Sequence, residues 1–278
     1  MKISIITSTF NSGSTVADTF KSVLSQTYKD IDYIVVDGAS SDNTLDIIRQ
    51  YEGAFGGRMR WISEKDGGVY DAMNKGISMA KGDVIGFLNS DDFFTSNDCL
   101  QTIVDAFAAS DIDATYGNVH YVNSDDLKLM VRFYSSKRFR PSLMRLGFMP
   151  AHPSFYCKRE IYEKYGKFDT SYKIASDFEL ILRFIYVNKI KTRYIAKDFV
   201  TMRTGGLSNS GFRSHQQIMS DHRKALKANH VYSNFFILCL RYFYKSYEVI
   251  KAHITGIIRR IHRGRTKPAP VIATQNAA

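Results

Sequence analysis

The sequence has little cysteine and no cysteine motif. Its three cysteines, Cys99, Cys157 and Cys239, are far apart in the chain, and no CxxC pair occurs. Disulfide frameworks and zinc clusters need paired or closely spaced thiols, so neither is expected here. The cysteine content therefore favours a protein of a reducing compartment.

The sequence also lacks a long apolar run. No stretch approaches the roughly 20 apolar residues of a transmembrane helix, and the longest candidate, Val231 to Leu240, is followed by Arg241. The apolar run at the start of the chain breaks at Thr7, without a small-residue cleavage site behind it, so a secretory signal is not expected. We expect a cytoplasmic protein, lying peripherally on the inner face of the cell membrane for reasons given below.

The common phosphate-binding glycine motifs are missing as well. There is no GxGxxG after the first expected strand, and no GxxxxGK[ST] occurs anywhere in the chain. A phosphate-bearing ligand would then have to be neutralised by a metal ion or by basic side chains.

What is present is the composition of a globular protein. The 278 residues are 44% hydrophobic and 13% aromatic, enough to form a substantial core. The formal charge of +11 is unevenly placed, because residues 1–110 carry a net −6 and residues 111–278 a net +17. A protein that binds nucleic acid along its whole surface would be basic throughout, whereas here the first range is acidic and only the second is basic. No nucleic-acid partner is therefore expected.

Strand and helix patterns alternate along the first half of the chain. Short β-branched or apolar runs predict strands at 3–8, 32–37, 58–62, 84–88 and 114–119. Helical spacing predicts helices at 14–26, about 42–51, 69–81 and 100–109. This order predicts an α/β fold with a mostly parallel central sheet flanked by helices on both faces.

Polar clusters follow three of these strands, at 7–11, at Asp37 and at 89–92. The carboxyl ends of parallel strands meet at one edge of a sheet, where ligands bind. Asp37 alone could be a helix-capping residue, but the adjacent Asp91 and Asp92 repel each other unless a cation lies beside them. Mg²⁺ or Mn²⁺ bridging diphosphate oxygens would fill that role.

Seven segments together resemble the family 2 glycosyltransferases, which have the GT-A fold and include enzymes of bacterial capsule, exopolysaccharide, colanic-acid and O-antigen synthesis. They occur in the family's order and cover about residues 1–205. The segments are SIITSTFN (4–11), SVLSQTY (22–28), YIVVDGASSDNT (33–44), EKDGGVYDAMNKGISMAKGD (64–83), FLNSDD (87–92), AHPSFYCKREIYEKYGKFD (151–169) and SDFELILRF (176–184).

The resemblance implies an inverting transfer from a nucleotide-sugar donor, most simply a UDP-sugar, to a saccharide or lipid-linked oligosaccharide acceptor. The residues it places on the donor are Thr9, Asn11, Asp37, Asp66, Asn74, Lys75, Asp91 and His152. His152 could equally touch the acceptor, or simply be hydrogen-bonded within a loop.

The same resemblance implies the catalytic centre. Asp91 and Asp92 would hold the divalent metal, although the first acid of the family's motif is Asn89 here. Asp177 matches the family's catalytic base, and the residue before it, often Glu in relatives, is Ser176. A carboxylate within hydrogen-bond reach of the attacking hydroxyl can take its proton.

The composition changes near residue 233. Apolar residues recur in steps of four and three from Phe236 to Ile261, among mostly positive charges, and residues 241–278 carry a net +7. Such a basic helix could bind an anionic membrane surface, pack on the catalytic domain, or pair with a second copy in a homodimer.

We divide the chain into a GT-A domain at 1–230 (a Rossmann-like donor half at 1–110 and an acceptor half at 111–230), a helical extension at 231–267 and a tail at 268–278.

Two other functions agree with parts of the sequence. A sugar-1-phosphate nucleotidyltransferase has a related architecture, but its loop after the first strand carries basic residues, whereas here that loop is STFNSGS. A non-catalytic protein that binds anionic surfaces would suit the basic half of the chain. It would leave the ordered acidic clusters unexplained.

Overall fold

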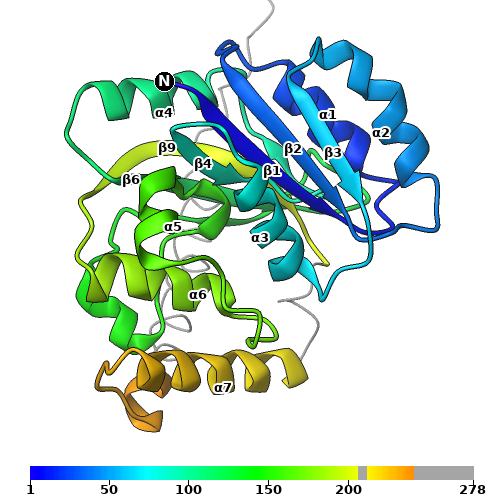
Figure 1. The fold of residues 1–278 in the computed structure, drawn as a ribbon. Helices are drawn as coiled ribbons and strands as arrows, with labels where there is room; N and C mark the ends of the chain where they lie inside the picture. Colours follow the sequence, from blue (N-terminus) through cyan, green and yellow to red (C-terminus); the bar gives the residue numbers. More distant parts are fainter. Residues whose placement is uncertain (206–211, 241–278) are drawn as a thin grey trace, which may run out of the picture.

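A computed structural model describes residues 1–205 and 212–240 (Figure 1). Its central sheet begins with four parallel strands in the order β3-β2-β1-β4. They are β1 (Ile3–Thr9), β2 (Ile31–Asp37), β3 (Met59–Ser63) and β4 (Val84–Phe87). These match the first four predicted strands to within one residue at either end.

The sheet becomes mixed beyond β4. Strand β8 (Tyr156–Lys158) is antiparallel to β4 and to β6 (Ala114–Val122), whereas β9 (Thr192–Arg203) runs parallel to β6. The short β5 (Phe93–Phe94) pairs with β9, and β7 (Met130–Tyr134) pairs with β6. The four parallel strands thus come from residues 1–110, and strands from residues 111–230 extend the same sheet.

Helices cover both faces of the sheet, and alternate side chains of β2 are therefore buried on opposite sides. Tyr33 and Val35 pack with α1 (Val16–Leu24), α2 (Thr44–Glu52) and α4 (Cys99–Ala108). Ile34 and Val36 belong to the core formed with α3 (Val69–Met79), α5 (Arg159–Tyr165) and α6 (Ser176–Ile181). The remaining short turns are η1 (Gly53–Phe55), η2 (Pro141–Leu146), η3 (His152–Ser154) and the π-helical η4 (Leu182–Val187).

Helix α7 (Phe212–Ala228) lies against α6 at the end of the molecule away from β3 (Figure 1). Residues 229–240, which follow it, stay on the domain, since Val231 and Leu238 are buried in the same core as α6. Phe236 and Leu240, the first two residues of the predicted apolar stripe, are instead 80% and 53% exposed. The rest of the predicted extension, from 241, and the tail at 268–278 lie outside the described residues.

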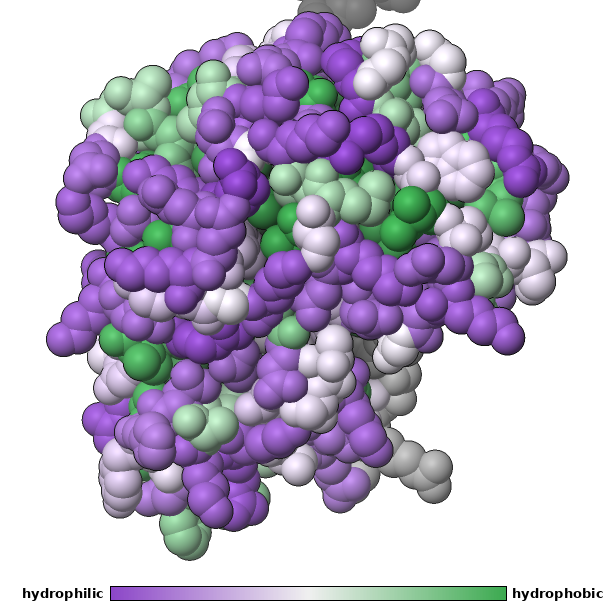
Figure 2. All heavy atoms as spheres, viewed as in Figure 1, coloured by the Kyte–Doolittle hydropathy of each residue, from purple (hydrophilic) through white to green (hydrophobic). Residues whose placement is uncertain are grey.

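The described surface is mostly hydrophilic, with small apolar patches between polar side chains on the face seen in Figure 2. Within residues 1–205 and 212–240, no helix is both long and apolar enough to cross a membrane.

Candidate active site

A cleft of about 1380 Å³ opens at the carboxyl ends of β1 and β4. Side chains from four separate parts of the chain face it: Thr9 at the end of β1, Asp91 and Asp92 after β4, Asp177 on α6, and His215 on α7. The sheet edge predicted to bind a ligand is therefore one wall of a single cleft, which α6 and α7 close from the other side.

The cleft's β1 edge carries unused hydrogen-bonding groups. The hydroxyls of Ser8 and Thr9 are buried and make no hydrogen bond to any described residue. The next loop is fixed by Asn11, which has a left-handed backbone (φ 49°) and whose side-chain oxygen accepts the Ser41 N–H at 2.9 Å. Buried hydroxyls without partners cost free energy, so this edge is suited to a polar ligand.

Asp37 is completely buried at the end of β2. Its carboxylate accepts hydrogen bonds from the backbone N–H and hydroxyl of Ser40, at 2.9 and 2.5 Å, and from the hydroxyl of Ser63 at 2.6 Å. These contacts fix the turn through Gly38. The Asp37 carboxylate, which was predicted to contact the donor, is therefore not part of the cleft lining in this structure.

Asp66 does face the cleft, beside that turn. A Cβ on Gly38 would lie 2.8 Å from Asp66 Oδ2, so only glycine allows the two segments to approach this closely. The other carboxylate oxygen of Asp66 accepts the Gly68 N–H at 2.9 Å, just before α3 begins. Asp66 is thereby held beside the β2 turn, where its predicted donor contact would be made.

Asn74 and Lys75, also predicted to contact the donor, do not line the cleft in this structure. Asn74 exchanges two hydrogen bonds, of 2.8 and 3.0 Å, with the backbone of Phe168. The Lys75 ammonium lies 2.8 Å from a carboxylate oxygen of Glu64 and 3.1 Å from the carbonyl oxygen of Lys65. Both side chains tie α3 to neighbouring segments.

The acidic pair lies in the floor of the cleft. Asp92 is 1% exposed and accepts a 3.3 Å hydrogen bond from the Asn89 amide. Burial raises the pKa of both carboxyls, and the charge of Asp91 raises the pKa of Asp92 further. Their negative charges are therefore poorly compensated by the described residues.

Arg203, at the end of β9, is a cation beside this pair that belongs to none of the predicted site residues. Its guanidinium donates to the carbonyl oxygen of Asp91 and pairs with Asp18 at 2.6 Å. It also lies over the ring of Phe93. Arg203 thus fixes the backbone of the acidic pair. The β-branched and aromatic residues of β9 are the sequence pattern that could have indicated the strand on which Arg203 lies.

These residues fit a divalent cation. Both carboxylates line the cleft, and because burial disfavours their negative charge, a cation beside them would stabilise the charged form. Hard cations bind carboxylate oxygens together with phosphate oxygens and water. No cluster of three or more His, Cys, Asp or Glu side chains suited to a metal occurs within the described ranges. A cation held here would take its remaining ligands from diphosphate and water.

Asp177 and His152, which both line the cleft, are in contact with each other. Asp177 is in the first turn of α6, His152 begins η3, and Asp177 Oδ2 lies 3.2 Å from His152 Nδ1. The second carboxylate oxygen of Asp177 accepts the N–H of Phe178. The structure therefore brings the predicted base and the predicted His152 together in the cleft that the acidic pair also lines.

The turn that carries Asp177 is held from two sides. Buried Asp221, on α7, accepts the backbone N–H groups of Ile174 and Ala175 at 2.9 and 3.2 Å. The hydroxyl of Tyr70, on α3, donates to the Ile174 carbonyl oxygen. Asp221 belongs to none of the motifs read from the sequence.

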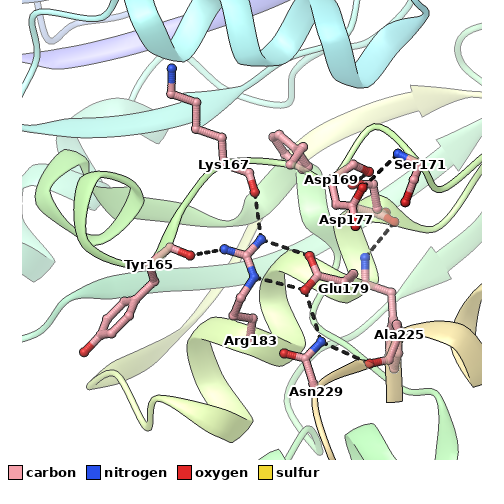
Figure 3. Close-up of polar contacts among 12 residues, drawn as sticks. Tyr165, Lys167, Asp169, Ser171, Asp177, Glu179, Arg183, Ala225 and Asn229 are labelled. Carbon is pink, nitrogen blue, oxygen red and sulfur yellow. Dashed lines mark hydrogen bonds and ion pairs between the residues drawn. The ribbon is translucent and has the colours of Figure 1, made fainter. Parts of the chain in front are cut away.

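A polar network behind α6 completes this support (Figure 3). Buried Glu179 pairs with Arg183 through hydrogen bonds of 3.0 and 2.9 Å and accepts a third from Asn229 at 3.1 Å. The same guanidinium donates to the backbone oxygens of Tyr165 and Lys167. A buried ion pair with further hydrogen bonds gives α6 one defined position relative to the loop before it and to the chain after α7.

Comparisons with known proteins agree with this arrangement. Residues 4–166 match the family described as Glycosyl transferase family 2. An uncharacterized glycosyltransferase of Mycobacterium tuberculosis is 34% identical over 208 residues, which are 73% of this chain and 76% of the relative.

Two solved structures share the fold at low sequence identity. S. aureus TarS (residues 1–349, with UDP-GlcNAc) has a TM-score of 0.61 and 18% identity, over 80% of this chain and 66% of that one. The mannosyltransferase PcManGT of Pyrobaculum calidifontis, in complex with GDP-Man and Mn²⁺, has a TM-score of 0.60 and 15% identity, over 91% and 82%. These likenesses confirm the predicted GT-A fold. With the family match and the 34% identical relative, they establish that the chain belongs to the family 2 glycosyltransferases.

Proposed function

We propose that the protein transfers a sugar, with inversion, from a UDP-sugar to a saccharide or lipid-linked oligosaccharide of a bacterial surface polysaccharide. The observation that carries the proposal is that a single cleft is lined both by the acidic pair Asp91–Asp92 and by Asp177, which lies beside His152. TarS, with which the chain shares its fold, was solved with UDP-GlcNAc, which supports a uridine nucleotide.

In this mechanism the acceptor hydroxyl attacks the anomeric carbon on the side away from the departing nucleoside diphosphate. A new bond from that oxygen to the anomeric carbon forms while the bond to the diphosphate breaks, and the configuration inverts. Asp177 takes the proton of the hydroxyl, and His152 is placed to orient the carboxylate.

Mn²⁺ or Mg²⁺ at Asp91 and Asp92 would supply charge neutralisation for the leaving diphosphate. The described contacts favour Asp91 as the direct ligand, because Asp92 is almost fully buried and already bonded to Asn89. Arg203 fixes the backbone of Asp91, and the unpaired hydroxyls of Ser8 and Thr9, with Asp66, are available to the nucleoside.

A thermal-shift titration of UDP-, GDP- and dTDP-sugars with and without Mn²⁺ tests this function. A ligand at 100 times its Kd stabilises the native state by about 2.7 kcal/mol, so the unfolding midpoint rises measurably. We expect a UDP-sugar with Mn²⁺ to give the largest shift. No shift with any nucleotide sugar would contradict the proposal.

We further propose that the chain beyond α7 brings the enzyme to an anionic membrane surface from the cytoplasmic side. Support comes from the exposed Phe236 and Leu240 and from the basic sequence that follows them. Leu238 is buried in the core, so a truncation should start at residue 241. Loss of binding to anionic liposomes in that variant is expected. Unchanged binding, together with a dimer that dissociates on truncation, would favour a homodimer seam instead.

A further inference from the structure

The strand β7 exposes an apolar surface at an edge of the sheet. It pairs with β6, and no other strand lies beside it within residues 1–205 and 212–240. Large apolar side chains within residues 127–133 are each between 38% and 57% exposed: Leu127, Leu129, Met130, Val131 and Phe133. Edge strands usually carry charge or are covered, and an exposed apolar patch of this kind marks a binding surface.

A β-bulge decides which of these side chains share a face. Phe133 is opposite His120 of β6. Met130 is opposite Val122, two residues further along β6. The register shifts between these two pairs, and Val131 is the extra residue of the bulge. Because residues two apart in a strand lie on one face, Met130 and Phe133 share a face of β7.

The other face of β7 belongs to the cleft. Arg132 and Tyr134 line it, and the Arg132 guanidinium lies 5.7 Å from the centre of the Tyr134 ring. Met130, Val131 and Phe133 are not part of the cleft lining. The apolar surface is therefore separate from the candidate active site, although one strand carries both.

Positive charge accompanies the apolar side chains. Residues 124–140 contain five Lys or Arg and two Asp, all of them exposed: Lys128, Arg132, Lys137, Arg138, Arg140, Asp125 and Asp126. A second copy of the chain pairing along β7 would bring two such sets of like charges together, which is unfavourable. An anionic bilayer instead offers negative headgroups above a hydrocarbon region, so it complements both the charge and the apolar side chains.

We propose that residues 127–133 bind an anionic lipid bilayer, with Met130, Val131 and Phe133 inserted between the headgroups. This surface shares its partner with the membrane contact proposed above, but it is formed by described residues, none of them beyond 240. Since Arg132 and Tyr134 line the cleft on the other face of the strand, the bilayer would lie beside the cleft. The benefit of that position to a lipid-linked acceptor rests on the proposed function.

A tryptophan placed in the bulge of the full chain tests the contact directly. The native protein has one tryptophan, Trp61, on β3, where the sheet begins. With vesicles of equal parts phosphatidylglycerol and phosphatidylcholine, we expect the emission of Val131→Trp to shift to shorter wavelength and to be quenched by brominated acyl chains. Val187→Trp, at an exposed valine ending η4, is the matched control and should be quenched no more than the wild type.

Vesicle affinity, measured by sedimentation of the full chain, is the second readout. Phe133→Ser should weaken binding to the anionic vesicles by about tenfold, since an aromatic side chain no longer leaves water. Val187→Ser should leave the affinity unchanged. Vesicles of phosphatidylcholine alone should bind the wild type more weakly than the anionic vesicles, because the positive charges then have no anionic partner.

Vesicle binding without quenching of Val131→Trp would overturn the proposal, because the contact would then belong to another part of the chain. So would an unchanged affinity in Phe133→Ser, or a dimer in solution that dissociates in this variant and binds no vesicles. The thermal shift with a UDP-sugar and Mn²⁺ should be the same in Phe133→Ser and the wild type. Its absence in the wild type would instead count against the proposed function.

Discussion

The imidazole Nδ1 of His152 lies 3.2 Å from Oδ2 of Asp177, and the two residues reach the cleft from different elements, η3 and α6. A carboxylate oriented by an imidazole is a defined acceptor for a proton. Both residues line the same cleft as Asp91 and Asp92. In the proposed mechanism this one cleft holds the base and the carboxylates that would bind the metal.

Asp177→Asn should remove transfer while leaving donor binding intact. The amide cannot accept the hydroxyl proton, so we expect a rate loss on the order of 10²–10⁴. Sugar transfer and UDP-sugar affinity, measured on the same preparation, check this. Asp169→Asn, at a carboxyl bonded to Ser171 and outside the cleft lining, is the control and should transfer normally. Near wild-type rates in Asp177→Asn would exclude it as the base.

Asp91→Asn should abolish the part of donor binding that depends on Mn²⁺. An amide oxygen is a weaker ligand for a hard cation than a carboxylate, so the thermal shift with UDP-sugar and Mn²⁺ should fall towards the metal-free value. Asp111→Asn removes an exposed carboxylate paired with Lys191 and serves as the control. An undiminished Mn²⁺ effect in Asp91→Asn would place the metal elsewhere.

Asp221→Ala should impair catalysis through the position of Asp177. It removes the acceptor of the Ile174 and Ala175 N–H groups, so kcat should fall by about tenfold or more with little change in the KM for donor. Asp221→Asn keeps one acceptor oxygen and should restore most of the activity.

Gln217→Ala is the control for Asp221, because it removes only the 2.8 Å bond to the other carboxylate oxygen. Unfolding midpoints show whether the substitutions act through stability alone. If kcat fell in step with the unfolded fraction, Asp221 would have a purely structural role.

Asp98 gives a pH-dependent contribution to stability. Hydrogen bonds from the Lys197 ammonium and the Ser96 hydroxyl lower the pKa of Asp98 to about 2. A lowered carboxyl pKa stabilises the fold above the unfolded value near 4, and this stabilisation is lost as the pH falls towards 2. Asp98→Asn should cost under about 1 kcal/mol at pH 7, because the Asp98 side chain is 60% exposed, and almost nothing at pH 2. Denaturant unfolding at both pH values measures this; equal costs would contradict the assignment.

The sequence by itself was sufficient for the fold and for several residues that line the cleft. β-Branched runs buried on both faces predict β1, β2 and β4, and the rule that ligands bind at the carboxyl ends of parallel strands predicts the cleft. Thr9, Asp91 and Asp92 follow from these local patterns, since each stands within a few residues of a strand's end. The family match then confirmed the enzyme class.

Only the tertiary structure decided which side chains meet. Asn74 looks like a donor ligand in its motif, yet it bonds the backbone of Phe168, a contact between segments distant in the chain. The contact of His152 with Asp177, and the support from Asp221, likewise join elements that no periodicity relates. Local patterns report burial and backbone conformation, whereas a catalytic geometry depends on how the mixed half of the sheet and α7 pack around the parallel half.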